Sequence, residues 1–154
     1  MSAVTTELLF DLKLDLDREN TQDVGATPHG HRRIVPVIGG SFTGPKLKGE
    51  VLPVGADWLL IRPDGAKEVD ARITLRTDDR QLIYMTYRGV DTGSPDVARR
   101  LASGEMVDPS EYYFRIQPFF ETGSNKYGWL NQLVSVGFGK RVATALAYTV
   151  YAVL

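Results

Sequence analysis

Several stretches of this chain carry charged or aromatic side chains at every second position. Because successive side chains of a β-strand point to opposite faces, this spacing gathers them on one face. Three such stripes are Asp70, Arg72, Thr74 and Arg76; Tyr113, Arg115, Gln117, Phe119 and Glu121; and Trp129, Asn131, Leu133 and Ser135. Carboxylates next to guanidinium and phenol groups are suited to acid–base chemistry on a small molecule.

Asp57 is the first candidate for a catalytic acid or base. It follows a bend at Gly55, and burial against the indole of Trp58 or Trp129 would raise its pKa towards neutral. Further candidates for proton transfer or oxyanion donation are Asp70, Glu121 and Tyr113. The structural alternative is equally open: Asp57 satisfies local backbone amides, and the other two carboxylates form ion pairs with arginines of their own strands.

A second set of side chains could bind a substrate. Guanidinium groups bind a carboxylate or enolate, tyrosine hydroxyls donate to an oxyanion, and tryptophans provide an apolar wall. The candidates are Arg33, Trp58, Arg72, Tyr84, Arg115, Trp129 and Asn131. Each also has a structural interpretation: an arginine clamp at the end of a sheet, an aromatic packed on a strand, or an asparagine that caps a turn.

The sequence predicts neither a metal site nor a cofactor site. His29 and His31 lie two residues apart in a polar segment, and the chain has no third histidine and no cysteine. Residues 137–139 lack the glycine spacing of a dinucleotide site, and no phosphate-binding loop occurs. An enzyme of this sequence is therefore expected to work with its own side chains.

Bulk composition excludes several other classes. The formal net charge of the 154 residues is −1, which gives no electrostatic case for nucleic acid or an anionic membrane as a partner. No apolar run approaches the ~20 residues that span a bilayer, and the first residues do not resemble a secretory leader. Without cysteines, the chain fits a reducing compartment, so a cytoplasmic location is expected.

Alternation of apolar and polar residues predicts mostly β-strands. Residues 8–17 have period two, residues 18–33 read as a long polar loop, and residues 94–104 read as the single helix, with Ser94 as N-cap and Gly104 as its stop. Further strands are predicted at 34–42, 47–52, 58–61, 68–77, 81–88, 112–122, 130–138 and 144–153. Pro118 makes a bulge plausible within the strand at 112–122.

Glycines and prolines concentrate between Gly39 and Trp58, in GGSFTGPKLKGEVLPVGADW, as at the corners of a closed sheet. This stretch, together with RRIVPVIGG, DWLLIRPDG, EVDARITLRTDD, DPSEYYFR, FETG and YGWLN, resembles the family catalogued as domain of unknown function three-two-three-seven, also called uncharacterised protein family zero-three-one-one. The resemblance covers residues 8–138 and implies a small β-barrel. It leaves the reaction open.

The expected fold is therefore all-β: a single antiparallel β-barrel of about eight to ten strands with one short helix, forming one domain over residues 1–154. We favour the interpretation in which the charged stripes look into the barrel and line a pocket, while Lys13 and Lys67 are solvated. The alternative is a packed apolar core with the stripes in solvent.

Three functions fit this expectation. The first is an acid–base enzyme of the isomerase, cyclase, dehydratase or hydrolase type that acts on a small carbonyl or aromatic compound. The second is a non-catalytic carrier or sensor of a small molecule, as other small barrels are. The third is a structural homo-oligomer whose interface lies in residues 143–154, which are apolar on both faces. Such a segment is equally consistent with a central strand. The residues after Lys140 resemble the family least.

Overall fold

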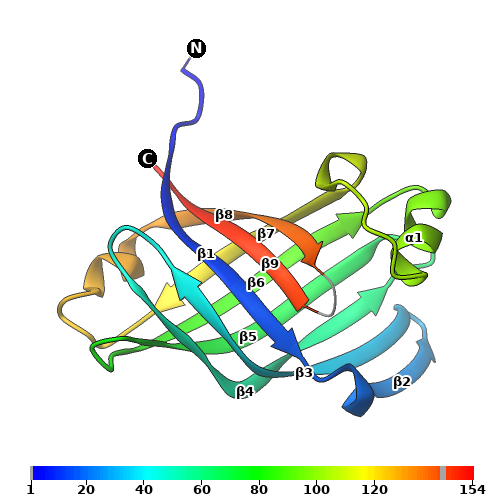
Figure 1. Ribbon diagram of the computed structural model, residues 1–154, viewed down its shortest axis with the longest axis horizontal. Coiled ribbons are helices and arrows are strands. Elements are labelled where there is room, and N and C mark those ends of the chain that lie inside the picture. The colour runs from blue at the N-terminus through cyan, green and yellow to red at the C-terminus, as the bar shows by residue number, and fades with distance from the viewer. Residues whose placement is uncertain (1, 143–144) are drawn as a thin grey trace.

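Eight antiparallel strands close into a barrel in the computed structural model, which describes residues 2–142 and 145–154 (Figure 1). The strands are β1 (Thr6–Leu16), β2 (Gln22–Thr27), β3 (Gly30–Thr43), β4 (Lys48–Ile61), β5 (Lys67–Thr77), β6 (Leu82–Thr92), β7 (Tyr113–Glu121), β8 (Val134–Val142) and β9 (Ala145–Val153). The helical elements are α1 (Pro95–Ala102) and the short 3-10 turns η1 (Arg18–Asn20), η2 (Pro109–Glu111) and η3 (Gly128–Gln132).

The sheet runs in the order β1-β9-β8-β7-β6-β5-β4-β3-β2, and a pairing between β1 and β3 closes it. The strand β2 pairs with the first half of β3 and stays outside the ring. The all-β barrel predicted from the sequence is thus confirmed. The segment 18–33 is not one long loop, because it holds η1, β2 and the start of β3.

The interior is filled mainly by the apolar faces of the strands. Buried residues alternate along β1, β5 and β6 and come together in one cluster. Its largest fully buried members are Phe10, Phe42, Tyr87, Phe114 and Tyr148. The favoured orientation of the charged stripes on β5 and β7 is therefore wrong: Ala71 and Ile73 point inwards, and the stripe of Asp70 and Arg72 faces outwards. Burying large apolar side chains outweighs any gain from enclosing charges.

Two glycines allow the backbones to approach closely at the bends of β3 and β4. Gly40 has φ of 145° and lies against the carbonyl of Lys13, and Gly55 has φ of 107° and lies against the carbonyl of Arg72. The pairing of β4 with β5 shifts register between Val51 and Gly55. Since only glycine tolerates such φ values at this distance, the sequence signal for tight corners was correct.

Several predicted boundaries moved. The strands expected at 47–52 and 58–61 form one bulged strand, β4, and the strand expected from residue 130 begins only at Val134 because η3 precedes it. Pro118 causes no bulge: β7 pairs with β6 without a shift, and Pro118 lies opposite Tyr87. The missing N–H of Pro118 is on the β8 side, where Ser135 Oγ donates to the Pro118 carbonyl at 2.7 Å.

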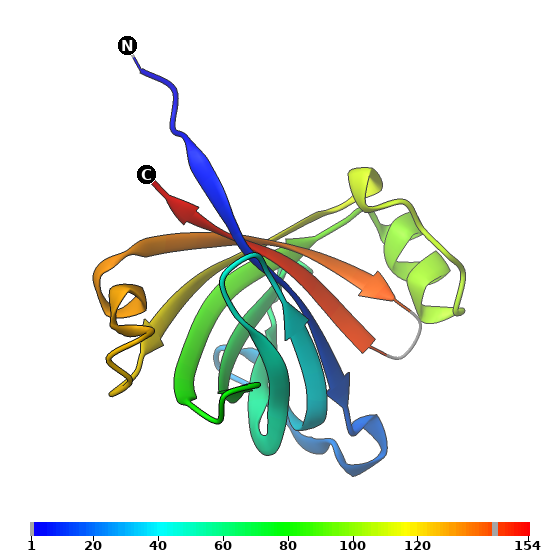
Figure 2. The ribbon, with the colours of Figure 1, turned by 60° about the vertical axis from the view of Figure 1, so that its left-hand side comes forward.

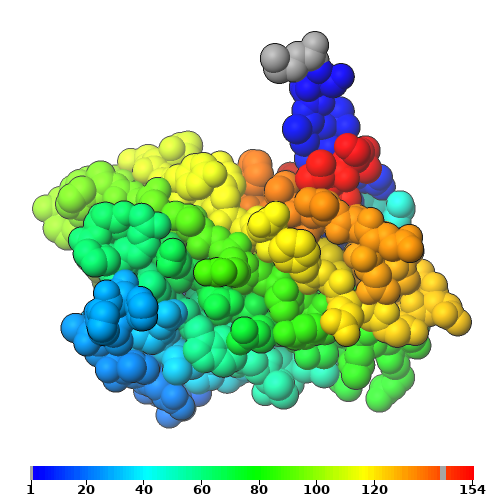
Figure 3. Space-filling view, turned by 180° about the vertical axis from the view of Figure 1, so that it is seen from behind, coloured from blue at the N-terminus to red at the C-terminus, as the bar shows by residue number. Residues whose placement is uncertain are grey.

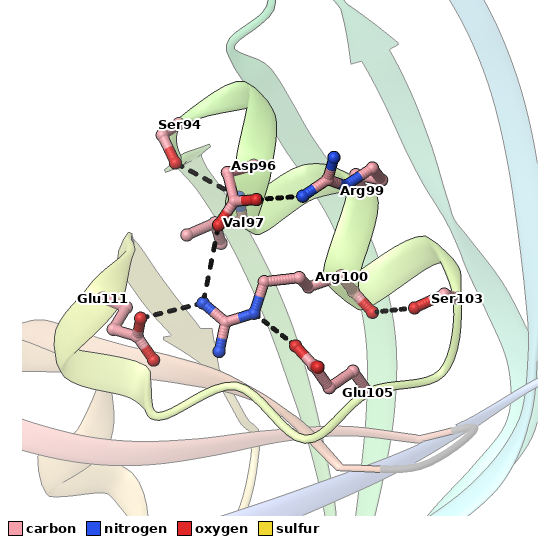
Figure 4. A network of polar contacts seen from close by, with 8 residues as sticks. All are labelled: Ser94, Asp96, Val97, Arg99, Arg100, Ser103, Glu105 and Glu111. Carbon is pink, nitrogen blue, oxygen red and sulfur yellow. Dashed lines mark hydrogen bonds and ion pairs between the residues drawn. The ribbon is translucent and has the colours of Figure 1, made fainter.

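The predicted helix is present as α1, and Ser94 caps it by accepting a hydrogen bond from the backbone of Val97 at 3.1 Å. Figure 4 shows that Arg100 ties the helix to the chain that follows, by ion pairs with Glu105 and, at 2.9 Å, with Glu111. The segment from α1 to η2 is therefore held together by its own side chains.

The barrel has two different ends, with α1 at one and η3 at the other (Figures 1 and 2). At the η3 end, Asp79 accepts hydrogen bonds from the hydroxyl of Tyr127 at 2.9 Å and from Nζ of Lys126 at 2.8 Å, and Leu130 is buried in the core. We call the other end the mouth: there the last residues of β4, β6 and β8 meet the first residues of β5, β7 and β9.

The C-terminal strand β9 lies between β1 and β8. Leu146, Tyr148 and Val150 fill the interior, and Tyr151 faces outwards against Phe138 at a ring distance of 5.8 Å. The apolar character of both faces thus has the second explanation, a central barrel strand. The first residue of the predicted strand, Thr144, lies outside the described residues. A homo-oligomer stays a prediction.

Candidate functional site

Asp57 is a charged side chain that the fold turns into the barrel. The register shift in β4 brings it opposite Ala71, on the inner face, where it is 5% exposed. Its Oδ1 accepts a hydrogen bond of 3.0 Å from the backbone N–H of Asp70. An aspartate this deeply buried is rare unless its environment compensates the lost hydration.

Burial raises the pKa of Asp57 to about 6. The hydrogen bond from the Asp70 backbone acts in the opposite direction, the negative charge of Asp70 adds to the rise, and the charges of Arg141 and Arg18 lower it again. Desolvation dominates because the carboxylate loses water on nearly all sides. The result is a carboxyl group that changes protonation state close to neutral pH.

Two fully buried tyrosines lie near Asp57. The hydroxyls of Tyr87 and Tyr148 are 3.3 Å apart, and their rings lie 5.2 Å apart. Burial raises the pKa of both phenols, and the charge of Asp57 contributes to the rise in each. Both hydroxyls therefore stay protonated.

At the mouth, Arg141 at the end of β8 pairs with the buried Asp91 at the end of β6. The Nε of Arg141 is itself buried and has no hydrogen-bond partner among the described residues. An unsatisfied guanidinium nitrogen is costly in a protein interior. The guanidinium group therefore has one donor that the rest of the described chain does not use.

Asp57, Asp91 and Arg141 share a small hollow of about 100 Å³ inside the mouth. Its other polar walls are Arg18, Arg33 and Lys67, and its apolar walls are Leu16, Val35, Leu59, Ile61, Val69, Phe114 and Leu146. Burial and then the charge of Arg141 lower the pKa of Lys67, and the same two causes lower that of Arg18. The cations around the opening thus make it less favourable for one another to stay charged.

Two larger hollows adjoin the first. One, of about 550 Å³, lies between α1 and the mouth and shares Arg18, Lys67 and Arg141 with it; its further walls are Ala98, Leu101, Ala102, Gly104, Glu105, Met106 and Val107. The other, of about 380 Å³, lies towards β2 and shares Arg18 and Arg33. Both larger hollows thus share cationic side chains with the inner hollow that Asp57 lines.

Most binding residues predicted from the sequence lie elsewhere. Arg33 lines the mouth with Asp57, as predicted. Trp58 and Arg72 stack on each other on the outer face at 5.1 Å, so neither walls Asp57. Arg115 also faces outwards, between Tyr113 at 4.8 Å and Phe138 at 4.1 Å. The apolar wall of the hollow that Asp57 lines consists of aliphatic side chains and Phe114, and it contains no indole.

The remaining predicted residues lie towards the η3 end. Tyr84 is paired with Glu121 in the ladder of β6 and β7, and both are exposed. Trp129 packs against the core with Lys46 over its ring at 5.4 Å. Asn131 caps a turn by exchanging hydrogen bonds with the backbone of Thr122, at 2.8 and 2.9 Å. These four residues and Asp57 do not form one site.

Sequence reasoning missed most of the mouth. Lys67 and Asp91 share their strand faces with the buried Val69 and Tyr87, so extending the apolar period of two to the strand ends would have found them. Lys67, which was expected to be solvated, is half-buried and lines two hollows. Arg18 carries no such signal, since η1 interrupts the pattern.

A separate groove of about 370 Å³ lies on the outer face over β5, β6 and β7. It contains Tyr113 and Arg115 from the predicted set, together with Arg88 and Glu68. Seen from behind, the side chains of these strands make up the middle of the surface (Figure 3). Its charged side chains are in contact with solvent, so it lacks the desolvation that shifts the pKa of Asp57.

Within the described ranges, no three His, Asp or Glu side chains gather closely enough to hold a metal ion. No helix among the described elements combines the length and apolar character needed to cross a bilayer.

The fold and the mouth define a small closed β-barrel with a polar, cation-lined opening. The chain belongs to the family described as "Protein of unknown function (DUF3237)", whose profile matches residues 4–153. It is 42% identical over 125 residues to a UPF0311 protein of Rhodopseudomonas palustris, covering 81% of this chain and 82% of the relative. It is 41% identical over 113 residues to a UPF0311 protein of Clostridium acetobutylicum, covering 73% and 72%. The predicted family is therefore confirmed.

Solved structures agree with the barrel. A conserved protein of unknown function from R. palustris superposes with a TM-score of 0.93 at 36% identity over 100% of both chains. A β-barrel-like protein from Acinetobacter baumannii gives 0.86 at 40% identity over 100% of this chain and 98% of that one. A protein described as an enzyme from Penicillium herquei gives 0.73 at 20% identity, over 100% and 97%, and at that identity it shows the fold alone.

Proposed function

We propose that the chain is an enzyme that uses Asp57 as a general acid–base on a small carbonyl or aromatic compound bound at the mouth. The observation that supports this proposal is the buried carboxyl group of Asp57, with a pKa of about 6, facing a hollow that opens past cations. A catalytic acid or base works best when its pKa is near the working pH. Perturbed carboxyl groups in clefts are good candidates for this role.

The chemistry follows from the groups around the hollow. Ionised Asp57 takes a proton from the carbon next to a carbonyl group, and the electron pair moves onto the carbonyl oxygen. Arg141, which lines the same hollow, stabilises the resulting enolate. Protonated Asp57 then returns the proton to the same or another atom. This first step is common to isomerisation, many cyclisations and dehydration, and in a hydrolase Asp57 would take its proton from water instead.

The size of the inner hollow limits what reaches Asp57. About 100 Å³ accommodates a carbonyl group and a few neighbouring atoms, and the adjoining 550 Å³ is within the range that holds a small organic molecule. The apolar walls of the inner hollow exclude water around Asp57 and the reacting atoms. Electrostatic stabilisation by Arg141 is stronger in such an environment than in water.

Exchange of carbon-bound hydrogen tests the proposal without knowledge of the product. A panel of small ketones, diones and keto acids is incubated with the protein in deuterium oxide, and loss of the α-proton signal is followed by NMR. We expect exchange of at least one compound, and we expect Asp57→Asn to slow it by about a hundredfold or more. The matched control is Asp70→Asn, because Asp70 points outwards. It should leave the rate nearly unchanged at a pH well above the pKa of Asp57, where Asp57 is ionised in both proteins.

Two results would contradict the enzyme proposal. If Asp57→Asn exchanges as fast as the unaltered protein, Asp57 is not the base. If compounds of the panel bind tightly in calorimetry but neither exchange nor form products, the protein is a carrier or sensor, and the enzyme proposal is wrong.

A further inference from the structure

We infer that the mouth selects amphipathic keto acids: one carboxylate held by Arg18 and Lys67, a carbonyl group that reaches Asp57, and an apolar body that lies under α1. This inference deepens the proposed function and rests on it for the role of the carbonyl group. It concerns a binding site made of three parts, two of which the acid–base step does not use.

The carboxylate part follows from the charges at the mouth. The two hollows nearest the strands are lined by four cations, Arg18, Arg33, Lys67 and Arg141, and by three carboxylates, Asp23, Asp57 and Asp91. Arg141 is engaged by Asp91, and Asp23 is engaged by His31 at 2.6 Å. Within the described part of the chain, neither Arg18 nor Lys67 has a carboxylate within 4.0 Å.

The excess of one positive charge favours a monoanion over a dianion. A carboxylate carries one charge, whereas a phosphate monoester carries nearly two at neutral pH. The cations also lower one another's pKa, as Lys67 and Arg18 show, so an anion between them would relieve a repulsion that the fold otherwise tolerates. The unused Nε of Arg141 offers one further donor at the same opening.

The apolar part is formed by α1 and the segment that follows it. Leu101 and Val107 lie against the 550 Å³ hollow and are packed into the core, and Met106 lines it while 83% exposed. Such an exposed methionine at the rim of a hollow is adaptable and suits contact with a ring or an alkyl chain. The three parts meet because Arg18 and Lys67 line both this hollow and the inner one.

The charged side chains of α1 and of the segment after it form ion pairs with one another. Arg100 pairs with Glu105 and Glu111, and Arg99 pairs with Asp96, as Figure 4 shows. Glu105 lines the large hollow, but Arg100 neutralises it. Arg99 and Arg100 together face the three carboxylates of Asp96, Glu105 and Glu111, so this segment adds no positive charge, and the attraction for an anion comes from the barrel side alone.

Three related probes separate the parts of the site by calorimetry. Benzoylpropanoate has a carboxylate, a ketone and a phenyl ring; its primary amide lacks the charge; and levulinate has the charge and ketone but a methyl group in place of the ring. We expect benzoylpropanoate to bind about tenfold tighter than either of the other two, as one charge-assisted contact or one buried ring provides. Its affinity should fall as sodium chloride is added.

Matched variants assign the effect to residues. Arg18→Gln and Lys67→Gln should each weaken benzoylpropanoate by about tenfold and leave the amide nearly unchanged. Met106→Ser should reduce the advantage of benzoylpropanoate over levulinate. The control is Arg88→Gln, which removes a cation from the outer groove and should change nothing. Arg18 is the first residue of η1 and is exposed, so we expect its substitution to keep the fold, which circular dichroism checks.

The inference is overturned if the amide binds as well as the acid, if Arg18→Gln and Lys67→Gln bind benzoylpropanoate unchanged, or if neither acid binds at millimolar concentration. The two proposals fail separately. If binding depends on the charge of the ligand but no exchange depends on Asp57, the keto-acid site is supported and the enzyme proposal is wrong. If exchange depends on Asp57 but is equally fast for neutral ketones, the enzyme proposal is supported and the keto-acid site is wrong.

Discussion

The backbone N–H of Asp70 donates a hydrogen bond of 3.0 Å to Oδ1 of Asp57, while the two carboxylates point to opposite faces of the barrel wall. The pair shows how one sheet gives two aspartates different chemistry. Asp57 loses its water and its pKa rises to about 6, whereas Asp70 stays on the outer face. Of these two aspartates, only Asp57 lines the hollow at the mouth, so the first predictions concern it.

Replacing Asp57 by asparagine should stabilise the fold above pH about 6. The folded pKa is raised, so the folded chain holds its proton to higher pH than the unfolded chain, and stability is lost as pH rises from about 4 to about 6. A shift of roughly two units corresponds to about 3 kcal/mol. Urea unfolding of Asp57→Asn should show this gain at neutral pH and little at pH about 4. Equal stability of variant and parent at both pH values would show that the pKa is not raised.

The α-proton exchange proposed above should depend on pH through the same group. Its rate should rise as Asp57 ionises and level off above an apparent pKa of about 6. The charges that act on this ionisation are those of Asp70, which raises the pKa, and of Arg141 and Arg18, which lower it. Arg18→Gln should therefore move the midpoint of the profile upwards. A midpoint that stays fixed in Arg18→Gln would exclude Asp57 as the titrating group.

Arg141→Met should be strongly destabilising, because it leaves the buried carboxylate of Asp91 without its ion pair. We expect a loss of about 3 kcal/mol in the free energy of unfolding. The double variant Arg141→Met, Asp91→Asn should recover part of it, since the uncompensated charge is gone. The control is Arg72→Met on the outer face, which should cost less than about 1 kcal/mol. A single and a double variant of equal stability would contradict the explanation.

At the η3 end, Asp79→Asn should lower the melting temperature at neutral pH and not at strongly acid pH. The hydrogen bonds from Lys126 and then Thr77 hold the pKa of Asp79 well below its usual range. The stability that they provide is present above the ordinary carboxyl pKa of about 4 and is lost as pH falls through the lower folded value. Melting curves across this range check the prediction. Lys126→Met should reproduce part of the effect, and Asp78→Asn serves as the control on the same turn.

Gly40→Ala should destabilise the barrel by about 2 kcal/mol or more, because an added Cβ would meet the carbonyl oxygen of Lys13 at 2.1 Å and φ is 145°. Gly123→Ala is the matched control: nothing lies within 4 Å of the added atom. Chemical denaturation compares the two variants. A barrel that tolerates both equally well would show that the close approach of β1 to β3 can relax.

Much of the fold could be read from residue patterns. Period-two alternation predicted strands that correspond to β1, β5, β6 and β7, Ser94 and Gly104 marked α1, and the glycines between Gly39 and Gly55 marked the corners. The hairpin of β2 and β3 was missed, because polar side chains on both faces of a strand outside the ring leave no alternation to detect.

The candidate site was predicted only in part. Asp57 and Arg33 were identified from the sequence and lie at the mouth, whereas Arg18, Lys67, Asp91 and Arg141 were not. The stripes of Asp70 and Arg115 had the right composition for a pocket but lie on the outer face. Period-two alternation shows that the two faces of a strand differ, but it does not show which face turns inwards.

The sequence by itself determined the set of strands, their apolar faces, the tight corners and the family. Only the tertiary structure decided which strand ends meet, because closure through the pairing of β1 with β3 brings the ends of β1, β4, β6 and β8 to one opening. Residues as distant in sequence as Arg18 and Arg141 become neighbours there. The pKa of Asp57 depends on that same closure, because desolvation is a property of everything packed around a group and is absent from the order of residues along the chain.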